Sequence, residues 1–426
     1  MPFAALDLHK KIVEAVVLDD TGNVLHRDRF ATTREALTDF ARNHLPPGTH
    51  IAVEATTNTW AVVRLLQPFV AEVVVSNPLR TRAIAEAKVK TDKVDALVLA
   101  NLLRCDFLPR VWIPDQETIA LRHQSTERAN LVADRTRIKN RIHSVLHQRL
   151  IQAPSDDLFS PRSLAWLRQL EIDALGRQAL DRHLRQLDHL EAEIFDLSGE
   201  LAQQANDDPR IKLLMTLPGA DFPVAQTLSA AFGDVSRFPT ADKAAAYLGL
   251  VPSTRQSAHH CYHGPITKQG NSHARWMLVQ AAQSLDSHPG PLGVFFRKLA
   301  KRKNRNVAVV ATARKLVTIA WHMLKNNEPY RYAQPSTLKA KFDRLRIRAT
   351  GQKKPNGSKK GAPRPANYGS GVRTRAVPSV DDVMAEAGLP PLQPLAPGEQ
   401  KMIGERGSAA FARSIRQAKR IPRRSK

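Results

Sequence analysis

The chain has 426 residues, which is too long for one ordinary hydrophobic core and predicts two or three domains. Its 64 Lys and Arg outnumber its 40 Asp and Glu, so the net charge of +24 favours a polyanionic partner, with nucleic acid ahead of an acidic membrane surface. Arg314 and Lys315 interrupt the most apolar stretch, residues 307–324, so the sequence predicts no membrane-spanning helix. No signal peptide is predicted either. The two cysteines fit no disulfide framework, so we expect a cytoplasmic protein without a membrane partner.

The first 112 residues are predicted to form an α/β domain. An Asp-Asp-Thr-Gly turn at 19–22 favours a hairpin between the second and third strands. Three antiparallel strands followed by β-α-β are the order of the RNase H-like fold. The expected strands are 3–8, 11–18, 24–30, 50–53 and 71–75, with one helix that begins at Thr33 and another over 60–66.

Four carboxylates in this domain indicate its function. Asp7 interrupts an apolar strand, where an acid is costly unless it binds something positive, and Glu54 ends the fourth strand. Asp92 and Asp95 open a helix and share one of its faces, because they lie three residues apart. Taken singly, Asp92 could be an acid that the dipole favours at a helix N-terminus, and Glu54 could be an exposed acid at the end of a strand. Together the four predict a site for Mg²⁺ or Mn²⁺ that cuts nucleic acid.

Residues 113–208 are predicted to form a helical hairpin or coiled-coil arm. Residues 116–150 contain no Pro or Gly, and the second helix repeats apolar residues over about three heptads. One interpretation is a pair of helices with a solvated outer face. The other, favoured by six basic residues within 22 positions of the first helix, is a dimerisation arm that contacts nucleic acid. The candidate contacts there are Arg135, Lys139 and Arg141.

A second, mostly helical domain is predicted over residues 209–335, with helices at 211–217, 224–232, 273–285 and 307–324. The turn at Pro218–Gly219 is typical of modules that hold a phosphate at a helix N-terminus. Asp221 would repel a phosphate there, so a purely structural turn is the alternative. Further basic candidates for nucleic-acid contact are Arg255, Lys268, Arg275, Arg302 and Arg305.

Residues 253–264 carry the second chemical hypothesis. A hydroxyl nucleophile needs a base and a positive field around the phosphodiester. The possible bases are His259, His260 and His263. Arg255, Lys268 and Arg275 lie nearby in the sequence and could supply the positive field. Cys261 among these histidines suggests zinc, but the spacing is too tight for four tetrahedral ligands, so basic loop residues near DNA are the favoured interpretation.

The order Asp7 in LDLHKK, Glu54 in VEAT, and Asp92 and Asp95 in KTDKVDA resembles the DEDD transposases of bacterial insertion sequences. The amino-terminal domain of that family is similar to the RuvC Holliday-junction resolvases. LGLVP at 248–252 and ITKQGN at 266–271 resemble the family's second domain. The resemblance implies a recombinase directed by a structured guide RNA, which pairs with donor and target DNA at the bacterial nucleoid.

The resemblance also implies that the acids act with a nucleophilic serine of the second domain. Ser257 matches that serine best; Ala258 stands where the family more commonly has glycine, so Ser253 is the second candidate. To span two DNA ends, the protein is expected to form a homo-oligomer, from dimer to tetramer. The alternative functions are a metal-dependent junction-resolving nuclease without serine chemistry and a non-catalytic nucleic-acid-binding protein.

The composition changes after residue 335. Residues 339–426 contain 21 Lys and Arg against 6 acids, and eight prolines fall between 355 and 397. Such a segment is expected to be disordered when free and to add affinity for nucleic acid that does not depend on sequence. Residues 409–418 are predicted to fold into a short helix on binding.

Overall fold

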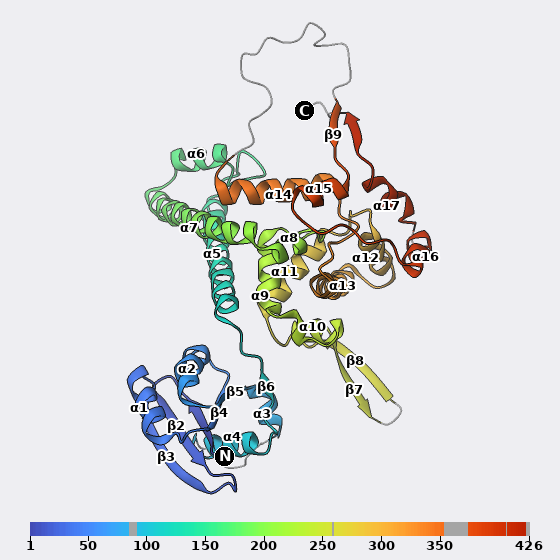
Figure 1. Cartoon of the computed structure of the whole chain (residues 1–426). Coiled ribbons are helices and arrows are strands. Elements are labelled where there is room, and N and C mark those ends of the chain that lie inside the picture. Colours follow the sequence, from blue (N-terminus) through green and yellow to red (C-terminus); the bar gives the residue numbers. More distant parts are fainter. Residues whose placement is uncertain (85–91, 258–259, 353–373, 406, 423–426) are drawn as a thin grey trace. The chain divides into compact units, whose positions relative to one another are not determined.

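The computed structural model describes residues 1–84, 92–257, 260–352, 374–405 and 407–422 (Figure 1). The chain divides into two compact units, Met1–Asp115 and Gln116–Lys426. The first unit ends close to the boundary at residue 112 that the sequence predicts, whereas the arm, the second domain and the tail belong to one unit.

The first unit is built on a six-stranded mixed sheet in the order β3-β2-β1-β4-β5-β6. β1, β2 and β3 are antiparallel, and β4 and β5 run parallel to β1. This arrangement confirms the expected α/β sheet and is consistent with a RuvC-like amino-terminal domain. The elements are β1 (Phe3–Leu8), β2 (Ile12–Leu18), β3 (Val24–Ala31), α1 (Arg34–His44), β4 (His50–Glu54), α2 (Thr59–Leu66), β5 (Glu72–Ser76), α3 (Pro78–Ile84), α4 (Asp92–Arg104) and β6 (Arg110–Val111).

Alternation along the strands assigns each residue to one of two faces of the sheet. Leu6 and Val53 pack in one cluster with Phe40 of α1 and Val63 of α2. Their neighbours on the opposite face pack against α4 instead; these are Ala5, Val16, Ala52 and Val74, with Ala96, Leu99 and Leu103 from the helix. Asp7 and Glu54 continue the second set, so both acids belong to the face that α4 covers.

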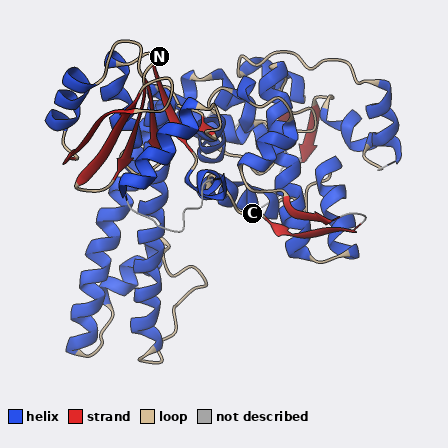
Figure 2. Ribbon diagram, turned by 90° about the horizontal axis from the view of Figure 1, so that it is seen from below, coloured by secondary structure: helices blue, strands red, loops and turns tan. Residues whose placement is uncertain are grey.

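The second unit begins with the predicted helical hairpin, in which α5 (Gln116–His147) and α7 (Ala174–Asp207) lie side by side (Figure 2). A short helix that the sequence did not predict, α6 (Pro161–Gln169), precedes α7. Leu180, Leu184 and Leu187 pack against Ile138 and Ile142 of α5. The heptad stripe is therefore covered within the chain, and pairing of two copies through it stays a prediction.

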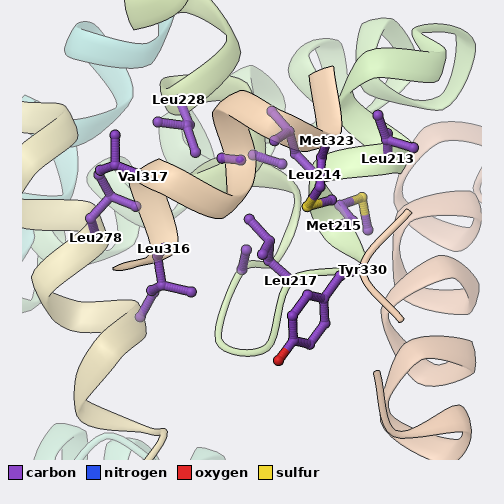
Figure 3. Packing of buried hydrophobic residues seen from close by; sticks show 14 of the residues in the cluster. Leu213, Leu214, Met215, Leu217, Leu228, Leu278, Leu316, Val317, Met323 and Tyr330 are labelled. Atoms are coloured by element: carbon purple, nitrogen blue, oxygen red, sulfur yellow. The ribbon is translucent and has the colours of Figure 1, made fainter. Parts of the chain in front are cut away.

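One large core holds the rest of this unit together (Figure 3). Its main helices are α8 (Pro209–Met215), α9 (Phe222–Phe232), α10 (Ala241–Tyr247), α11 (Ser272–Gln283), α12 (Pro291–Arg302), α13 (Arg305–Asn326) and α14 (Pro335–Thr350). Among the described residues, only α13 is long and apolar enough to cross a membrane. Its Leu316 and Val317 are buried in the core beside Leu278 and Leu228, as Figure 3 shows.

The turn between α8 and α9 has a structural role. Gly219 has φ +78°, and a Cβ there would lie 2.4 Å from the carbonyl oxygen of Ala281. Asp221 caps α9, where it accepts from the backbone N–H of Phe222, and its Oδ2 lies 2.8 Å from Nη2 of Arg344. These contacts favour the structural interpretation of the turn over a phosphate grip.

The basic tail is folded where the structure describes it, so the prediction of a disordered segment is wrong for these residues. They form β9 (Thr374–Val377), α15 (Val380–Glu386), α16 (Pro397–Glu405), α17 (Ala409–Ile415) and β10 (Lys419–Pro422). Val380, Met384, Ile403 and Ile415 are buried in the same core as α8 to α13. The prolines separate short amphipathic helices instead of preventing them. Residues 353–373 lie outside the described part.

Replacement of Met384 by Ala tests this packing. Met384 is 1% exposed, and removal of its side chain from a core is expected to cost about 2–4 kcal/mol in the free energy of unfolding. Guanidinium unfolding of the whole chain measures that loss. Lys401→Ala, at an exposed position of α16, is the control and is expected to change stability by less than about 0.5 kcal/mol. Equal midpoints for the two variants would mean that the tail does not contribute to the core.

Candidate active site

The acidic site in the first unit begins with two neighbouring parallel strands. Leu6 of β1 pairs in register with Val53 of β4, so the residues that follow them, Asp7 and Glu54, lie next to each other at the carboxyl ends of the strands. Both point to the face that carries α4, as the alternation of the strands requires. The sheet therefore brings together two of the four predicted acids, although 46 residues separate them in the sequence.

The third acid comes from α4, and a histidine connects it to the first. Nε2 of His9 lies 3.2 Å from Oδ2 of Asp7 and 3.3 Å from Oδ1 of Asp92. One ligand atom each of Asp7, His9 and Asp92 lie within 4.8 Å of one another. Atoms at such separations can share one cation, because a divalent ion holds its ligands at about 2.0–2.6 Å. Asp95 follows on the same turn of α4 and acts on Asp7 through its charge.

Burial is the main cause that raises the pKa of the Asp7 carboxyl. His9 lowers this pKa through its charge and its hydrogen bond, whereas the charges of Asp92 and Asp95 raise it. Asp7 thus lies in a partly desolvated place where other acids oppose its ionisation. A divalent cation would reverse that electrostatic balance, so the oxygen-rich donor set and its charge fit Mg²⁺ or Mn²⁺.

His9 is a site residue that the sequence analysis did not assign. It lies two positions after Asp7, and residues i and i+2 of a strand face the same side, so that spacing was the available signal. Its place beside both acids allows two roles. It can hold Asp7 and Asp92 in position through hydrogen bonds, or its imidazole can itself ligate a transition ion such as Mn²⁺.

Glu14 is a second acid that the sequence analysis missed. It pairs with Asp7 across β1 and β2, and with Arg29 across β2 and β3. The side chain is buried, and its Oε1 lies 3.0 Å from Nε of Arg29. On the other side, Ser76 pairs with Glu54 and has a buried hydroxyl without a hydrogen-bond partner among the described residues. A polar row thus crosses five strands on the α4 face, with Asp7 at its centre.

The candidate serine lies on a hairpin of the second unit, formed by β7 (Pro252–Ser257) and β8 (His260–Ile266). Glycines fix its base, since Gly249 and Gly270 have φ of +66° and +72°. A Cβ on Gly270 would lie 1.9 Å from the carbonyl oxygen of Tyr247, so no larger residue fits. The LGLVP and KQGN segments are therefore two sides of one close backbone crossing from which the hairpin projects (Figure 1).

The two serine candidates differ in their surroundings. Ser257 is exposed at the end of β7, and its cross-strand partner is His260. The hydroxyl of Ser253 instead donates to the carbonyl oxygen of Pro265 at 3.1 Å. Ser257 is therefore the more accessible of the two candidates. His263 lies with its Nδ1 3.0 Å from Oγ1 of Thr254. Ala258 and His259 lie outside the described residues.

Zinc is not supported at this hairpin. Sγ of Cys261 lies 3.8 Å from Nε2 of His263, and both side chains are exposed. Within the described part of the chain, Cys261 joins no group of three potential metal ligands.

Half of the basic residues predicted to contact nucleic acid are already engaged within the chain. Arg135 and Lys139 both face Glu191 of α7, at 3.2 and 3.5 Å. Arg275 donates to the carbonyl oxygens of Leu248 and Gln269, and Arg305 pairs with Asp286 at 2.7 Å. The exposed candidates are Arg141, Arg255, Lys268 and Arg302. Arg255 and Lys268 lie on or beside the hairpin that carries Ser257.

Comparisons with known proteins agree with the two groups of motifs. A family model for DEDD transposases of the IS110 type, described as a transposase, matches residues 4–150, and the model of the IS116/IS110/IS902 transposase family matches residues 211–293. The protein y4qE of Sinorhizobium fredii is 26% identical over 64% of this chain and 65% of its own length.

Two further relatives have informative names. The transposase for insertion sequence element IS1328 of Yersinia enterocolitica is 26% identical over 74% of this chain and 94% of its own length. The pilin gene-inverting protein of Moraxella bovis is 26% identical over 66% of this chain and 81% of its own length. Both family models and these names point the same way: the chain belongs to the IS110 family of DEDD insertion-sequence transposases.

Proposed function

We propose that this protein cuts and rejoins DNA through a metal site in its first unit and a serine nucleophile in its second unit. The observation that carries the proposal is the grouping of Asp7, His9 and Asp92, with Glu54 at the end of the strand next to Asp7, in a chain that belongs to a transposase family. The relative named for inverting a pilin gene supports a reaction in which DNA is both broken and joined.

The acids would hold one or two Mg²⁺ or Mn²⁺ ions, which when bound stabilise negative charge on a phosphodiester. Asp7 and Glu54 provide ligands from rigid strands, and Asp92 and Asp95 provide ligands from the first turn of α4. His9 orients the carboxylates of Asp7 and Asp92. Arg29 neutralises Glu14, so this buried acid beside Asp7 adds little repulsion to the site.

Ser257 performs the covalent step. Its Oγ attacks the phosphorus of a DNA phosphodiester, so that an O–P bond to serine forms while a P–O bond to deoxyribose breaks. The hydroxyl proton passes to an imidazole, for which His260, the cross-strand partner of Ser257, is the candidate, and the departing deoxyribose oxygen takes up a proton from water. The exposed Arg255 and Lys268 supply positive charge near the phosphate. Attack by a deoxyribose hydroxyl on the serine–DNA bond then rejoins a strand and releases Ser257.

A structured guide RNA and a homo-oligomer, dimer to tetramer, complete the proposal. The net charge of +24 and the resemblance to RNA-guided recombinases support the RNA. Two DNA ends must be held at once, which supports more than one copy of the chain. Because two of the three predicted arm contacts, Arg135 and Lys139, pair with Glu191, the exposed basic residues on and after the hairpin are the stronger candidates for backbone contact.

The experiment is a recombination assay with purified protein, the RNA that copurifies with it, and a plasmid that carries the ends of the mobile element. Rejoined DNA is expected in Mg²⁺, none is expected in EDTA, and added Mg²⁺ or Mn²⁺ should restore it. Nicked DNA without any rejoined product would favour the junction-resolving nuclease. DNA binding with neither product would favour the non-catalytic alternative.

Sequencing of the copurified RNA tests the guide in the same preparation. One structured RNA, encoded beside the gene and complementary to both the element end and the insertion site, is the expected result. A random mixture of cellular RNAs would count against guidance, and the cleavage chemistry would still be judged by the DNA products.

A further inference from the structure

A cavity of about 600 Å³ lies in the second unit among α5, α9 and α11, away from the serine hairpin. Its volume falls in the range of small-molecule sites, about 300–1,000 Å³. Its wall is mainly apolar, with a few polar side chains from each helix: Ser125, Arg128, Gln226, His273 and Trp276. Neither the acids nor the candidate serine contribute to it, so the proposed chemistry leaves it without a role.

Two buried polar atoms in this wall have no hydrogen-bond partner among the described residues. Gln226 is 1% exposed, and its Nε2 donates to the carbonyl oxygen of Leu201 at 2.7 Å. That bond fixes the orientation of the amide, so Oε1 is the acceptor left over, and it has no hydrogen-bond partner among the described residues. The buried hydroxyl of Ser125 also lacks one. Buried polar atoms in native proteins are normally satisfied, so this pair points to a ligand that offers hydrogen-bond donors and acceptors.

An aromatic surface stands beside these polar groups. The ring of Trp276 is half exposed, and it stacks on His273 with the ring centroids 6.2 Å apart and the planes at 21°. Burial lowers the pKa of His273, and the charge of Arg128 lowers it further, so the neutral form of the imidazole is favoured. A neutral imidazole under an exposed indole is a platform for another flat ring.

Arg128 gives the cavity a positive edge. Its Nε donates to Oγ of Ser198 at 2.9 Å, which leaves other guanidinium N–H groups for a ligand. Burial lowers the pKa of Arg128, and the charges of Arg135 and Arg348 lower it further. A cation that is partly desolvated and surrounded by like charge attracts an anion. Among the described residues, Arg128 forms no ion pair with a carboxylate.

We propose that this cavity receives one unstacked nucleobase of a single strand, with the base on Trp276, its polar edge on Gln226 and Ser125, and an adjoining phosphate on Arg128. The flat ring matches the face of a base, the unsatisfied acceptor and hydroxyl match its polar edge, and the partly buried cation matches the adjoining phosphate. The inference rests on the nucleic-acid partner of the proposed function and is independent of cleavage. Guide RNA and displaced DNA strands both present such bases, so the test separates them.

The test measures binding of fluorescein-labelled 12-nucleotide single strands, one of thymidine DNA and one of uridine RNA, to the full chain by anisotropy. Trp276→Ala is expected to weaken binding about tenfold, the usual size of one base–aromatic stack, whereas Trp276→Phe should restore most of it. Phe195→Ala, at another exposed aromatic of the same unit, is the matched control and should bind as the parent chain does. A loss for DNA alone or for RNA alone identifies the source of the base.

A second series removes one base at a time from the strand that binds better. The parent chain should lose affinity at one abasic position, and Trp276→Ala should not distinguish that position from the others. The inference is wrong if Trp276→Ala and the parent chain bind both strands equally. It is also wrong if the parent chain binds every abasic strand with the same affinity, because no single base then occupies the cavity. If the parent chain still recombines DNA in that case, the proposed function stands. If the parent chain binds neither strand and does not recombine DNA, both the proposed function and the base-binding cavity are contradicted.

Discussion

An Asp7→Asn chain is expected to cut DNA at least about a thousandfold more slowly than the parent chain, a loss of about 4 kcal/mol in transition-state stabilisation. Asp7 lies at the centre of the polar row, next to Glu54 in register and linked to Asp92 through His9. Asn keeps the shape of the side chain but removes the charge that a divalent ion requires. Cleavage of a labelled DNA substrate in Mg²⁺ measures the effect.

The same substitution is expected not to destabilise the fold, which separates a chemical role from a structural one. Burial raises the pKa of Asp7, so in the absence of metal its ionised form is less favourable in the folded chain than in the unfolded chain. A carboxyl with a raised folded pKa contributes stability that is lost as the pH rises from its ordinary value through that raised pKa. Asn has no such loss, so at neutral pH without metal the variant should unfold at the same temperature as the parent or above it.

Asp39→Asn is the matched control for this experiment. Asp39 is an exposed acid of α1 on the opposite side of the sheet from α4, outside the acidic cluster. It should cut DNA at the parental rate. Normal cleavage by Asp7→Asn would remove the acidic site from the mechanism, whatever its affinity for metal.

The second large effect is expected from Ser257→Ala, which should abolish both the covalent protein–DNA adduct and the rejoined product. The hydroxyl is the only group that this change removes, and Ser257 is exposed, so stability should not change. We expect recombination to fall at least about a thousandfold, as for loss of a nucleophile. Labelled DNA that migrates with the protein on a denaturing gel detects the adduct.

Ser253→Ala separates the two serine candidates. The Ser253 hydroxyl already donates to Pro265, so its loss should leave the adduct in place and weaken only the pairing of β7 with β8. An adduct that persists in Ser257→Ala and disappears in Ser253→Ala would reverse the assignment. Parental recombination by both variants would eliminate serine chemistry and favour hydrolysis at the acidic site.

The sheet and its acids were predictable because they depend on local patterns. Alternating apolar residues define the five main strands, and the order of these strands brings Asp7 and Glu54 to adjacent ends. His9 follows Asp7 by two positions, a spacing that is a local signal in the sequence, whereas its contact with Asp92 depends on where α4 packs. Glu14 was not predictable in this way, because its place beside Asp7 and Arg29 depends on the register of two hairpin pairings.

The helical unit shows where sequence patterns mislead. The basic residues of α5 resemble a nucleic-acid surface, yet Arg135 and Lys139 pair with Glu191, which lies more than 50 residues away. The tail has the composition of a disordered segment, but a few apolar residues such as Met384 and Ile403 find places in a core formed by distant helices. Composition counts residues, whereas burial depends on partners that a single segment does not reveal.

The proposed mechanism requires that Asp7, Glu54, Asp92 and Asp95 form a metal centre. Its most direct test is an anomalous difference map from crystals of the protein soaked in Mn²⁺. We expect a peak within about 2.0–2.6 Å of carboxylate oxygens of Asp7 and at least one other of these acids. The peak should be absent from Asp7→Asn crystals soaked in the same way. A map without a peak in this cluster at millimolar Mn²⁺, or with an equal peak in Asp7→Asn, would contradict it.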